Sequence, residues 1–257
     1  MLGAIIGDIV GSIYEFNNYR AKDFSPFFHA KSFYTDDSIC TIAIADALIN
    51  KKSPALALKD WGQRYWHNGG WGRSFALWLG SNSMAPYNSF GNGAGMRVSS
   101  AGFLAMSFEE AMELSDKVTE VTHNHPEGMK GARATTHAIW MALHGEKPEE
   151  ILKQISESYD YDLNRSIDEI RPTYRFNETC QRTVPEAIVC ALQADSYIDA
   201  IRSAISIGGD SDTVAAICGP IAEARFGIPE AIVIEGLSKL PQDILQILLA
   251  TYVEALE

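Results

Sequence analysis

Long, mostly apolar segments with helical spacing run through the whole chain. The most apolar of them covers residues 36–49, where between Ile39 and Ile49 only Thr41 and Asp46 are polar. Its length and alanine content favour a helix over a buried strand, and such a helix should be buried on most of its faces. Asp46 should then have a polar partner or lie at an opening in the packing.

Other segments have the same helical pattern of apolar residues: 109–118, 130–144, 184–194, 197–206, 213–226 and 242–256. Thr35 and the pair Ser53-Pro54 are typical helix starts, and Gly227 is a typical helix end. Gly3, Gly7 and Gly11 recur every four residues in the first apolar run, which indicates a helix face packed closely against a neighbour.

Signals for β-strands are few, because no alternating run of β-branched and aromatic residues is framed by hairpin turns. The stretch 62–100 is rich in Gly, Asn, Ser and Trp and predicts long loops, which in compact domains usually carry function. The stretch 160–180 mixes charge with Pro172 and predicts a surface excursion. No repeat or linker interrupts the chain. The sequence therefore predicts an all-α fold, a single compact multi-helix domain covering residues 1–257.

Charge and composition narrow the classes of function. The chain has 257 residues, 46% of them hydrophobic, and a formal net charge of −12. Such acidity disfavours general binding to nucleic acids or anionic membranes, because like charges repel. The N-terminal run has no positive region and contains Asp8, and no stretch is apolar for long enough to span a bilayer. We expect a cytoplasmic protein that does not bind membranes, is a monomer or weak oligomer, and has four free cysteines.

Two acidic clusters stand at predicted helix starts. Acids in a first turn are favoured by the helix dipole, so either cluster alone is equally well explained as helix capping. Together, however, they supply four carboxylates and two hydroxyls, the hard oxygen ligands that magnesium, manganese or calcium requires. The residues are Thr35, Asp36, Asp37, Asp210, Asp212 and Thr213.

The charge count favours two metal ions if the clusters meet in space. Four unpaired carboxylates would repel one another, and two divalent cations cancel their charge, whereas one leaves an excess of two. The segment 210–214 also fits the D-x-D-x-[TV] pattern of phosphatases that form an aspartyl-phosphate, but the residues that follow are too few and too helical for that fold. An EF-hand is excluded because its third ligand, central glycine and late glutamate are missing.

The segment 88–97 is dense in small residues and ends at Arg97. Closely spaced glycines let backbone N–H groups approach a phosphate, although a tight connector between helices explains the pattern equally well. His123 and His125 lack metal-ligand spacing and fit a polar loop better, with hydrogen bonding to a ligand as a further role. Most tryptophans between 61 and 78 should be core residues, with one aromatic ring able to stack on a purine.

Taken together, these segments resemble the ADP-ribosylglycohydrolase family. The matching motifs occur in the family's order and span nearly the whole chain. They are Gly7-Asp8-Ile9-Val10-Gly11-Ser12 with Glu15, Tyr34-Thr35-Asp36-Asp37-Ser38, Gly91-Asn92-Gly93-Ala94 with Met96-Arg97, Thr122-His123-Asn124-His125-Pro126, and Gly208-Gly209-Asp210-Ser211-Asp212-Thr213.

The resemblance implies an all-α domain with a pair of Mg²⁺ or Mn²⁺ ions in a central cleft. It implies that the metal ligands are Thr35, Asp36, Asp37, Asp210, Asp212 and Thr213. The residues implied to act in catalysis are Glu15, Asp36 and Asp212, with Glu15 acting on the water or gating the site. The implied contacts to the substrate, including its diphosphate, are Asn88, Ser89, Gly91, Asn92, Gly93, Ala94, Gly95 and His123, the last at the distal ribose.

The implied reaction is hydrolysis of the glycosidic bond at C1″, which releases ADP-ribose from a modified protein or small molecule. The family acts on arginine, serine and small-metabolite conjugates, and arginine is our first expectation. Three alternatives stay open: a silent ADP-ribose-binding or crystallin-like structural relative, a hydrolase of serine-linked or O-acetyl-ADP-ribose, and a metal-dependent phosphoesterase.

Overall fold

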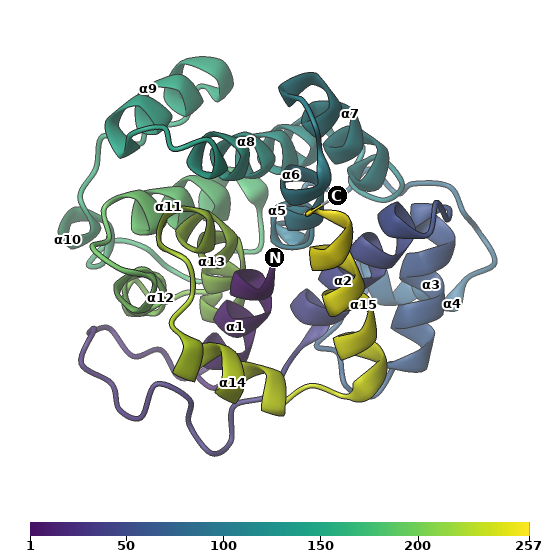
Figure 1. Cartoon of the computed structure of the whole chain (residues 1–257), viewed down its shortest axis with the longest axis horizontal. Helices are drawn as coiled ribbons and strands as arrows, with labels where there is room; N and C mark the ends of the chain where they lie inside the picture. Colours follow the sequence, from purple (N-terminus) through teal and green to yellow (C-terminus); the bar gives the residue numbers. More distant parts are fainter. Residues whose placement is uncertain (257) are drawn as a thin grey trace.

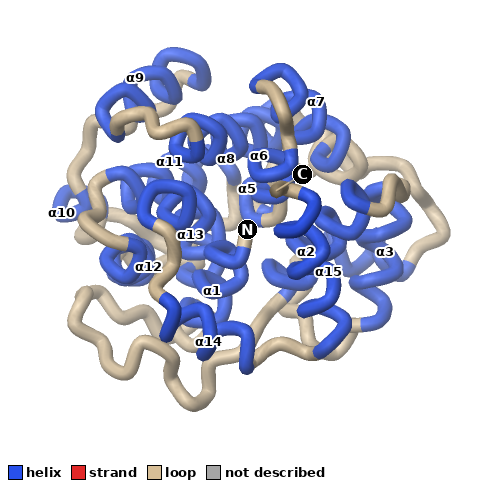
Figure 2. The backbone as a smooth tube through the Cα atoms, in the orientation of Figure 1, coloured by secondary structure: helices blue, strands red, loops and turns tan. Residues whose placement is uncertain are grey.

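Helix α1 (Leu2–Gly11) lies against α13 (Ser211–Phe226) near the middle of the molecule, and the other helices surround this pair (Figure 1). The computed structural model describes residues 1–256, and this range contains helices and loops but no strand (Figure 2). The predicted all-α fold is therefore confirmed. The remaining helices are α2 (Asp36–Ile49), α3 (Pro54–Arg64), α4 (Arg73–Gly80), α5 (Gly93–Met96), α6 (Ser99–Leu104), α7 (Phe108–Thr119), α8 (Pro126–Leu143), α9 (Pro148–Tyr159), α10 (Ile167–Ile170), α11 (Cys180–Leu192), α12 (Tyr197–Ser206), α14 (Glu230–Ser238) and α15 (Gln242–Glu254).

The predicted close packing of the N-terminal glycines is confirmed. A Cβ atom on Gly7 would lie 2.1 Å from the carbonyl oxygen of Ala215, and one on Gly11 would lie 2.5 Å from the Cα of Asp212. Only glycine permits two helix backbones to approach this closely. This contact brings the end of α1 next to the start of α13. Half of the predicted metal ligands lie at the start of α13.

Most predicted helices are present with small differences at their ends. The segment 36–49 coincides with α2, and the prediction for 197–206 coincides with α12. Asp46 has the predicted partners: Lys52 Nζ lies 2.8 Å from its carboxylate and Trp61 Nε1 lies 3.0 Å from it.

The prediction of long loops over 62–100 was wrong for part of the stretch, since α4, α5 and α6 lie there. These helices have only 8, 4 and 6 residues, too few for a clear apolar period. Two helices, α9 and α14, were not predicted. Only two residues of α9 are buried, Ile151 and Ile155, so its apolar stripe is thin. The stretch 160–180 contains α10 and several exposed residues, as a surface excursion requires.

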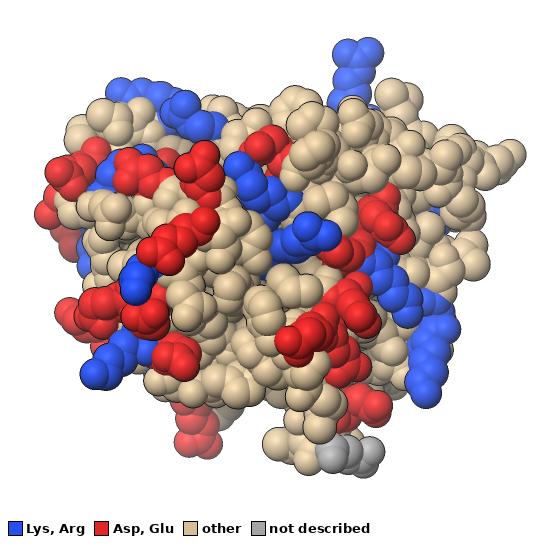
Figure 3. Space-filling model, turned by 90° about the horizontal axis from the view of Figure 1, so that it is seen from above, with Lys and Arg blue, Asp and Glu red and all other residues tan. Residues whose placement is uncertain are grey.

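The four cysteines are buried and unpaired, as predicted. No helix within residues 1–256 has the length and apolar character needed to cross a membrane. On the face shown in Figure 3, Lys and Arg side chains are interspersed with Asp and Glu. This mixed charge gives that face no continuous basic surface for a polyanion.

Candidate active site

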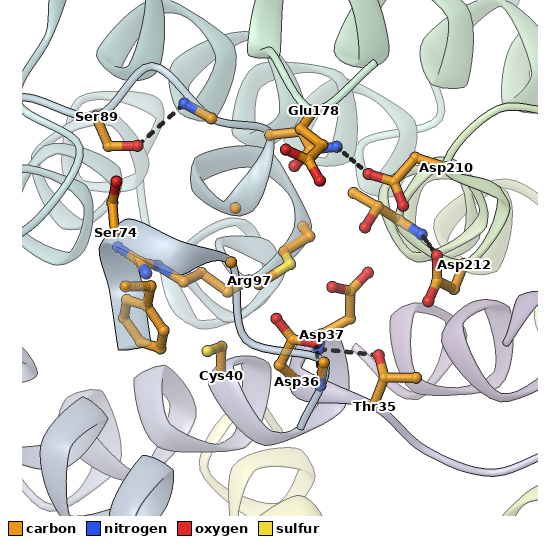
Figure 4. A pocket seen from close by; sticks show the side chains of 18 of the residues that line it. Thr35, Asp36, Asp37, Cys40, Ser74, Ser89, Arg97, Glu178, Asp210 and Asp212 are labelled. Atoms are coloured by element: carbon orange, nitrogen blue, oxygen red, sulfur yellow. Dashed lines mark hydrogen bonds between the residues drawn. The ribbon is translucent and has the colours of Figure 1, made fainter. Parts of the chain in front are cut away.

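A cavity of about 420 Å³ opens between the start of α2, the start of α13 and the segment 87–97. Carboxylates from the two helix starts face one another across it, and the Arg97 side chain extends away from them toward Ser74 (Figure 4). All six predicted metal ligands line this single cavity, and Glu15 lies among them. Residues that are almost two hundred positions apart in the sequence are thus brought together.

The first half of the acidic cluster is held by an N-cap and by a buried carboxylate. Thr35 caps α2, and its hydroxyl accepts a hydrogen bond of 3.3 Å from the backbone N–H of Asp37. Asp8, fully buried on α1, accepts hydrogen bonds from the backbone N–H of Thr35 at 2.9 Å and from its hydroxyl at 2.7 Å. Asp8 also accepts from the backbone N–H of Ser38 at 3.0 Å and from the Ser38 hydroxyl. Asp8 therefore fixes the turn from which Asp36 and Asp37 project.

The second half of the acidic cluster, Asp210 and Asp212, is positioned by two glycines in a left-handed conformation. Gly208 and Gly209 have φ values of +74° and +77°, which side-chain-bearing residues rarely adopt. Asn18 holds this turn: its amide donates to the carbonyl oxygen of Gly209 at 2.9 Å, and its carbonyl oxygen accepts from the Gly209 N–H at 2.8 Å. The turn places Asp210 at the N-cap of α13 and Asp212 in its first turn.

Glu15 lies in the turn after α1 and joins the second half of the cluster. One carboxylate oxygen from each of Glu15, Asp210 and Asp212 lies within 4.8 Å of the others, a spacing that suits a shared cation. Glu15 is half-buried, whereas Asp210 and Asp212 are buried. It is therefore the member of this trio with access to the open part of the cavity.

Burial and mutual repulsion raise the pKa values throughout the cluster. Burial and nearby carboxylates raise the pKa of Asp36 and of Glu15 to about 7. The same two causes raise the pKa values of Asp37 and Asp212 well above their usual range. Within the described residues no Lys or Arg forms a salt bridge with these four carboxylates.

The residues present fit a divalent metal. Oδ2 of Asp37 is buried and has no hydrogen-bond partner among residues 1–256, so this oxygen is free to bind a cation. The Thr35 hydroxyl donates its proton to Asp8 and accepts from Asp37 N–H, which leaves one lone pair for a cation. The donor set contains only oxygen, which favours Mg²⁺ or Mn²⁺ over zinc.

The predicted substrate contacts divide into two groups. Ser89, Gly91, Asn92, Gly93 and His123 line the same cavity as the acidic cluster. The Asn92 amide donates a 2.6 Å hydrogen bond to Asp210, so this segment is joined directly to the cluster.

Three other predicted contacts, Asn88, Ala94 and Gly95, are not among the residues that line the cavity. Ala94 is fully buried, and a Cβ on Gly95 would meet Val184 and Ile217. The reason is that residues 93–96 form a helical turn, α5, whose inner side packs into the core. Asn88 is exposed and has a φ of +57°, and its backbone N–H donates to the Asn124 side chain.

Several functional candidates were missed by reasoning from the sequence. Asp8 has no predicted role at the site, although a carboxylate inside an otherwise apolar helix is a usable signal. Glu178 lines the cavity from the irregular stretch 160–180. No tryptophan lines the cavity; its aromatic residues are Phe16, Phe33, Phe75 and Tyr87.

Comparisons with known proteins agree with this arrangement. The family model described as ADP-ribosylglycohydrolase matches residues 1–256. ADP-ribosylarginine hydrolase Tri1 of Pseudomonas putida (strain GB-1) is 27% identical over 264 residues, covering 89% of this chain and 70% of the relative. ADP-ribosylhydrolase ARH3 of Homo sapiens is 25% identical over 311 residues, covering 90% of this chain and 85% of the relative.

A solved structure described as an ADP-ribosylglycohydrolase-related protein complex shares the fold. Its TM-score is 0.74 at 19% identity, and the match covers 99% of this chain and 97% of the other. The match of the family model over nearly the full chain identifies this protein as a member of the ADP-ribosylglycohydrolase family.

Proposed function

We propose that this protein hydrolyses the glycosidic bond at C1″ of ADP-ribose and thereby releases ADP-ribose from a modified acceptor. The observation that carries the proposal is the convergence of the acidic cluster, whose carboxylates form no salt bridge within the described residues, in a cavity lined also by Asn92 and His123. Such a cluster is stable in its ionised form only when divalent cations neutralise it.

The cations would be held by the predicted ligands, which are Thr35, Asp36, Asp37, Asp210, Asp212 and Thr213. When bound, they would supply positive charge that holds ribose hydroxyls and lowers the pKa of a water molecule. The charge count of the cluster supports two Mg²⁺ or Mn²⁺ ions over one.

The chain's own groups would act on both sides of the bond that breaks. Positive charge develops at C1″ and the ring oxygen as the bond to the acceptor lengthens, and nearby carboxylates such as Asp36 and Asp212 stabilise it. Glu15 is the half-buried carboxylate beside Asp210 and Asp212, and this position allows it to accept a proton from water. The segment 89–93 would hold the diphosphate of the ligand.

Arginine is the acceptor that we favour. Tri1, a relative that spans most of this chain, is named an ADP-ribosylarginine hydrolase. Glu178 at the cavity wall, together with Glu15, would attract a cationic guanidinium group. Serine-linked and O-acetyl conjugates are the second candidates, because ARH3 is named an ADP-ribosylhydrolase without a stated acceptor.

The test is release of free ADP-ribose, measured by mass spectrometry, from arginine-linked, serine-linked and O-acetyl substrates in parallel with and without Mg²⁺. Metal-dependent release that is lost in Asp212→Asn would support the reaction and identify the acceptor. Tight binding of ADP-ribose with no release from any substrate would favour the silent binding protein instead. Release of phosphate from p-nitrophenyl phosphate would favour the phosphoesterase.

A further inference from the structure

Arg97 is a buried cation without an anionic partner. Its side chain is 1% exposed, yet no salt bridge joins it to a carboxylate within the described chain. Its Nε is buried and has no hydrogen-bond partner there. Burying an unpaired guanidinium lowers the stability of a fold, so this residue is poorly explained as a contribution to stability.

The contacts of Arg97 lead to His123. Nη2 of Arg97 lies 2.5 Å from the Thr122 hydroxyl oxygen and 3.3 Å from Nδ1 of His123. The Thr122 oxygen lies 2.8 Å from the same Nδ1. Thr122 is fully buried and His123 is 5% exposed, so water has little access to these atoms.

The chemistry of the three groups favours one set of hydrogen-bond directions. A guanidinium can only donate, so Arg97 donates both to the Thr122 oxygen and to Nδ1. The Thr122 hydroxyl proton is then available to donate to Nδ1 as well. A proton on Nδ1 could bond to the Thr122 oxygen at 2.8 Å, but it would then lie beside the guanidinium N–H at 3.3 Å, and this repulsion favours Nδ1 as the acceptor. Burial and the charge of Arg97 also hold the pKa of His123 well below its usual range.

A neutral imidazole with an unprotonated Nδ1 carries its proton on Nε2. That nitrogen faces the cavity segment that begins at Ser89. A Cβ on Gly93 would lie 3.2 Å from Nε2, and one on Gly91 would lie 3.6 Å from it. A side chain at Gly93 would crowd Nε2, and the cavity reaches both glycines.

We propose that Arg97 and Thr122 are positioning residues that hold His123 in its Nε2–H tautomer, so that Nε2 donates a hydrogen bond to an oxygen of ADP-ribose above Gly91 and Gly93. The proposal rests on the proposed function for the identity of the ligand. It adds that this end of the cavity selects a ligand oxygen that accepts a hydrogen bond, because the His123 tautomer is fixed before the ligand binds. The buried charge of Arg97 is thus retained for binding.

The first measurement is the tautomer of His123, by ¹⁵N NMR of histidine-labelled protein; the chain has six histidines, and His123→Gln assigns the signal. We expect a protonated Nε2 and an unprotonated Nδ1 in the wild type. Thr122→Val and Arg97→Met should mix the tautomers, and Thr122→Ser should restore the Nε2–H form. Thr119→Val is the matched control, since Thr119 is equally buried and its hydroxyl has no partner among residues 1–256. A wild-type imidazole protonated on Nδ1 would overturn the proposal.

The second measurement is the affinity for ADP-ribose, by calorimetry in the presence of Mg²⁺. Thr122→Val and Arg97→Met should each weaken binding by about three- to tenfold, the effect of one lost hydrogen bond. His123→Asn should weaken it similarly, whereas His123→Gln places an amide N–H near the former Nε2 and should weaken it less. The melting temperature should not fall in Arg97→Met, because removal of an unpaired buried charge offsets the loss of the hydrogen bonds to Thr122 and His123. Unchanged affinity and tautomer in both positioning variants would contradict the proposal.

The two proposals fail in different ways. If the wild type binds ADP-ribose and shows the Nε2–H tautomer but releases no product, the proposed reaction is wrong and this inference stands. If release occurs but the tautomer is Nδ1–H, the inference is wrong and the reaction stands. Failure of the wild type to bind ADP-ribose would overturn both.

Discussion

Asp8 and Thr35 are joined by two hydrogen bonds, one of 2.9 Å from the backbone N–H of Thr35 and one of 2.7 Å from its hydroxyl. Asp8 belongs to α1 and Thr35 caps α2, so this pair sets the direction in which Asp36 and Asp37 enter the cavity. The carboxylate is itself within repulsive range of the cluster, since its charge helps to raise the pKa of Asp37. The Asp8 carboxylate therefore orients Asp36 and Asp37 and also repels their negative charges.

Asp8→Asn should weaken metal binding more than it weakens the fold. An amide can accept from fewer of the N–H and O–H donors of Thr35 and Ser38, which should disturb the turn, while loss of the negative charge relieves repulsion in the metal-free state. We expect the Kd for Mg²⁺, measured by calorimetry, to rise about 10- to 100-fold. The melting temperature in EDTA should fall by only a few degrees.

Asp46→Asn is the matched control for this experiment. Asp46 is also a buried helical carboxylate, but its partners are Lys52 and Trp61, away from the cavity. This variant should lower the melting temperature and leave the Kd for Mg²⁺ unchanged. Equal losses of metal affinity in both variants would show that the effect of Asp8 is a general loss of stability.

The sequence was sufficient to predict the two halves of the acidic cluster. Each half lies at a helix start marked by Thr35 or by Gly208-Gly209. Such local patterns can be recognised in the sequence without knowledge of the fold. The two halves meet because α1 and α13 pack closely together. The spacing of Gly3, Gly7 and Gly11 identifies α1 as one of the two helices in this contact. The partner helix could not be read from that spacing.

Which of the predicted substrate contacts line the cavity was harder to predict, because side-chain direction depends on local geometry. Ala94 and Gly95 were grouped with Gly91 and Gly93 because all four lie in one small-residue run. The run turns into helix at Gly93, so neighbours in sequence point to opposite sides. The contact of Arg97 with His123 joins residues 26 positions apart, and no local pattern predicts it.

Asp36→Asn and Asp212→Asn should each reduce the release of ADP-ribose at least about 100-fold. Mutation of a residue that only supports a metal ligand typically reduces metal affinity or activity about 10- to 100-fold, and loss of a ligand itself should reduce activity by at least the upper value. The far-ultraviolet circular dichroism should stay that of a helical protein, because both side chains project from helix first turns into the cavity. Turnover and circular dichroism are measured on the same preparation. Wild-type turnover in both variants would remove the metal model.

Removal of metal should silence the protein reversibly. EDTA should abolish release of ADP-ribose, and Mg²⁺ or Mn²⁺ should restore it, whereas zinc should do so poorly because the site lacks sulfur and nitrogen ligands. Metal that binds only the folded state also raises stability, by about 2.7 kcal/mol at one hundred times its Kd. For a chain of this size that is a rise of about 5 to 10 °C in melting temperature. No shift at millimolar Mg²⁺ would argue against a preformed site.

The stabilisation by Mg²⁺ should increase as the pH rises. In the metal-free protein the pKa of Asp8 is raised to about 6, and the pKa values of Asp36 and Glu15 are raised to about 7. Below their ordinary pKa values these groups are protonated in both states. As the pH rises from there through 6 and 7, the folded state holds protons that the unfolded state has released, so the free energy of unfolding falls until the raised pKa values are passed. In the same range the ionised cluster becomes able to bind cations, so the metal-bound protein does not suffer this loss.

The measurement is the difference between the melting temperatures in Mg²⁺ and in EDTA from about pH 5 to about pH 8. His123 and His137, whose pKa values are lowered by burial, make stability rise with pH, but they do so in both solutions and largely cancel in the difference. Asp46→Asn should show the same pH profile as the wild type, whereas Asp36→Asn should flatten it. A difference that stays constant over this range in the wild type would mean that the carboxylates are already ionised without metal, which the lack of any salt bridge to them within the described residues argues against.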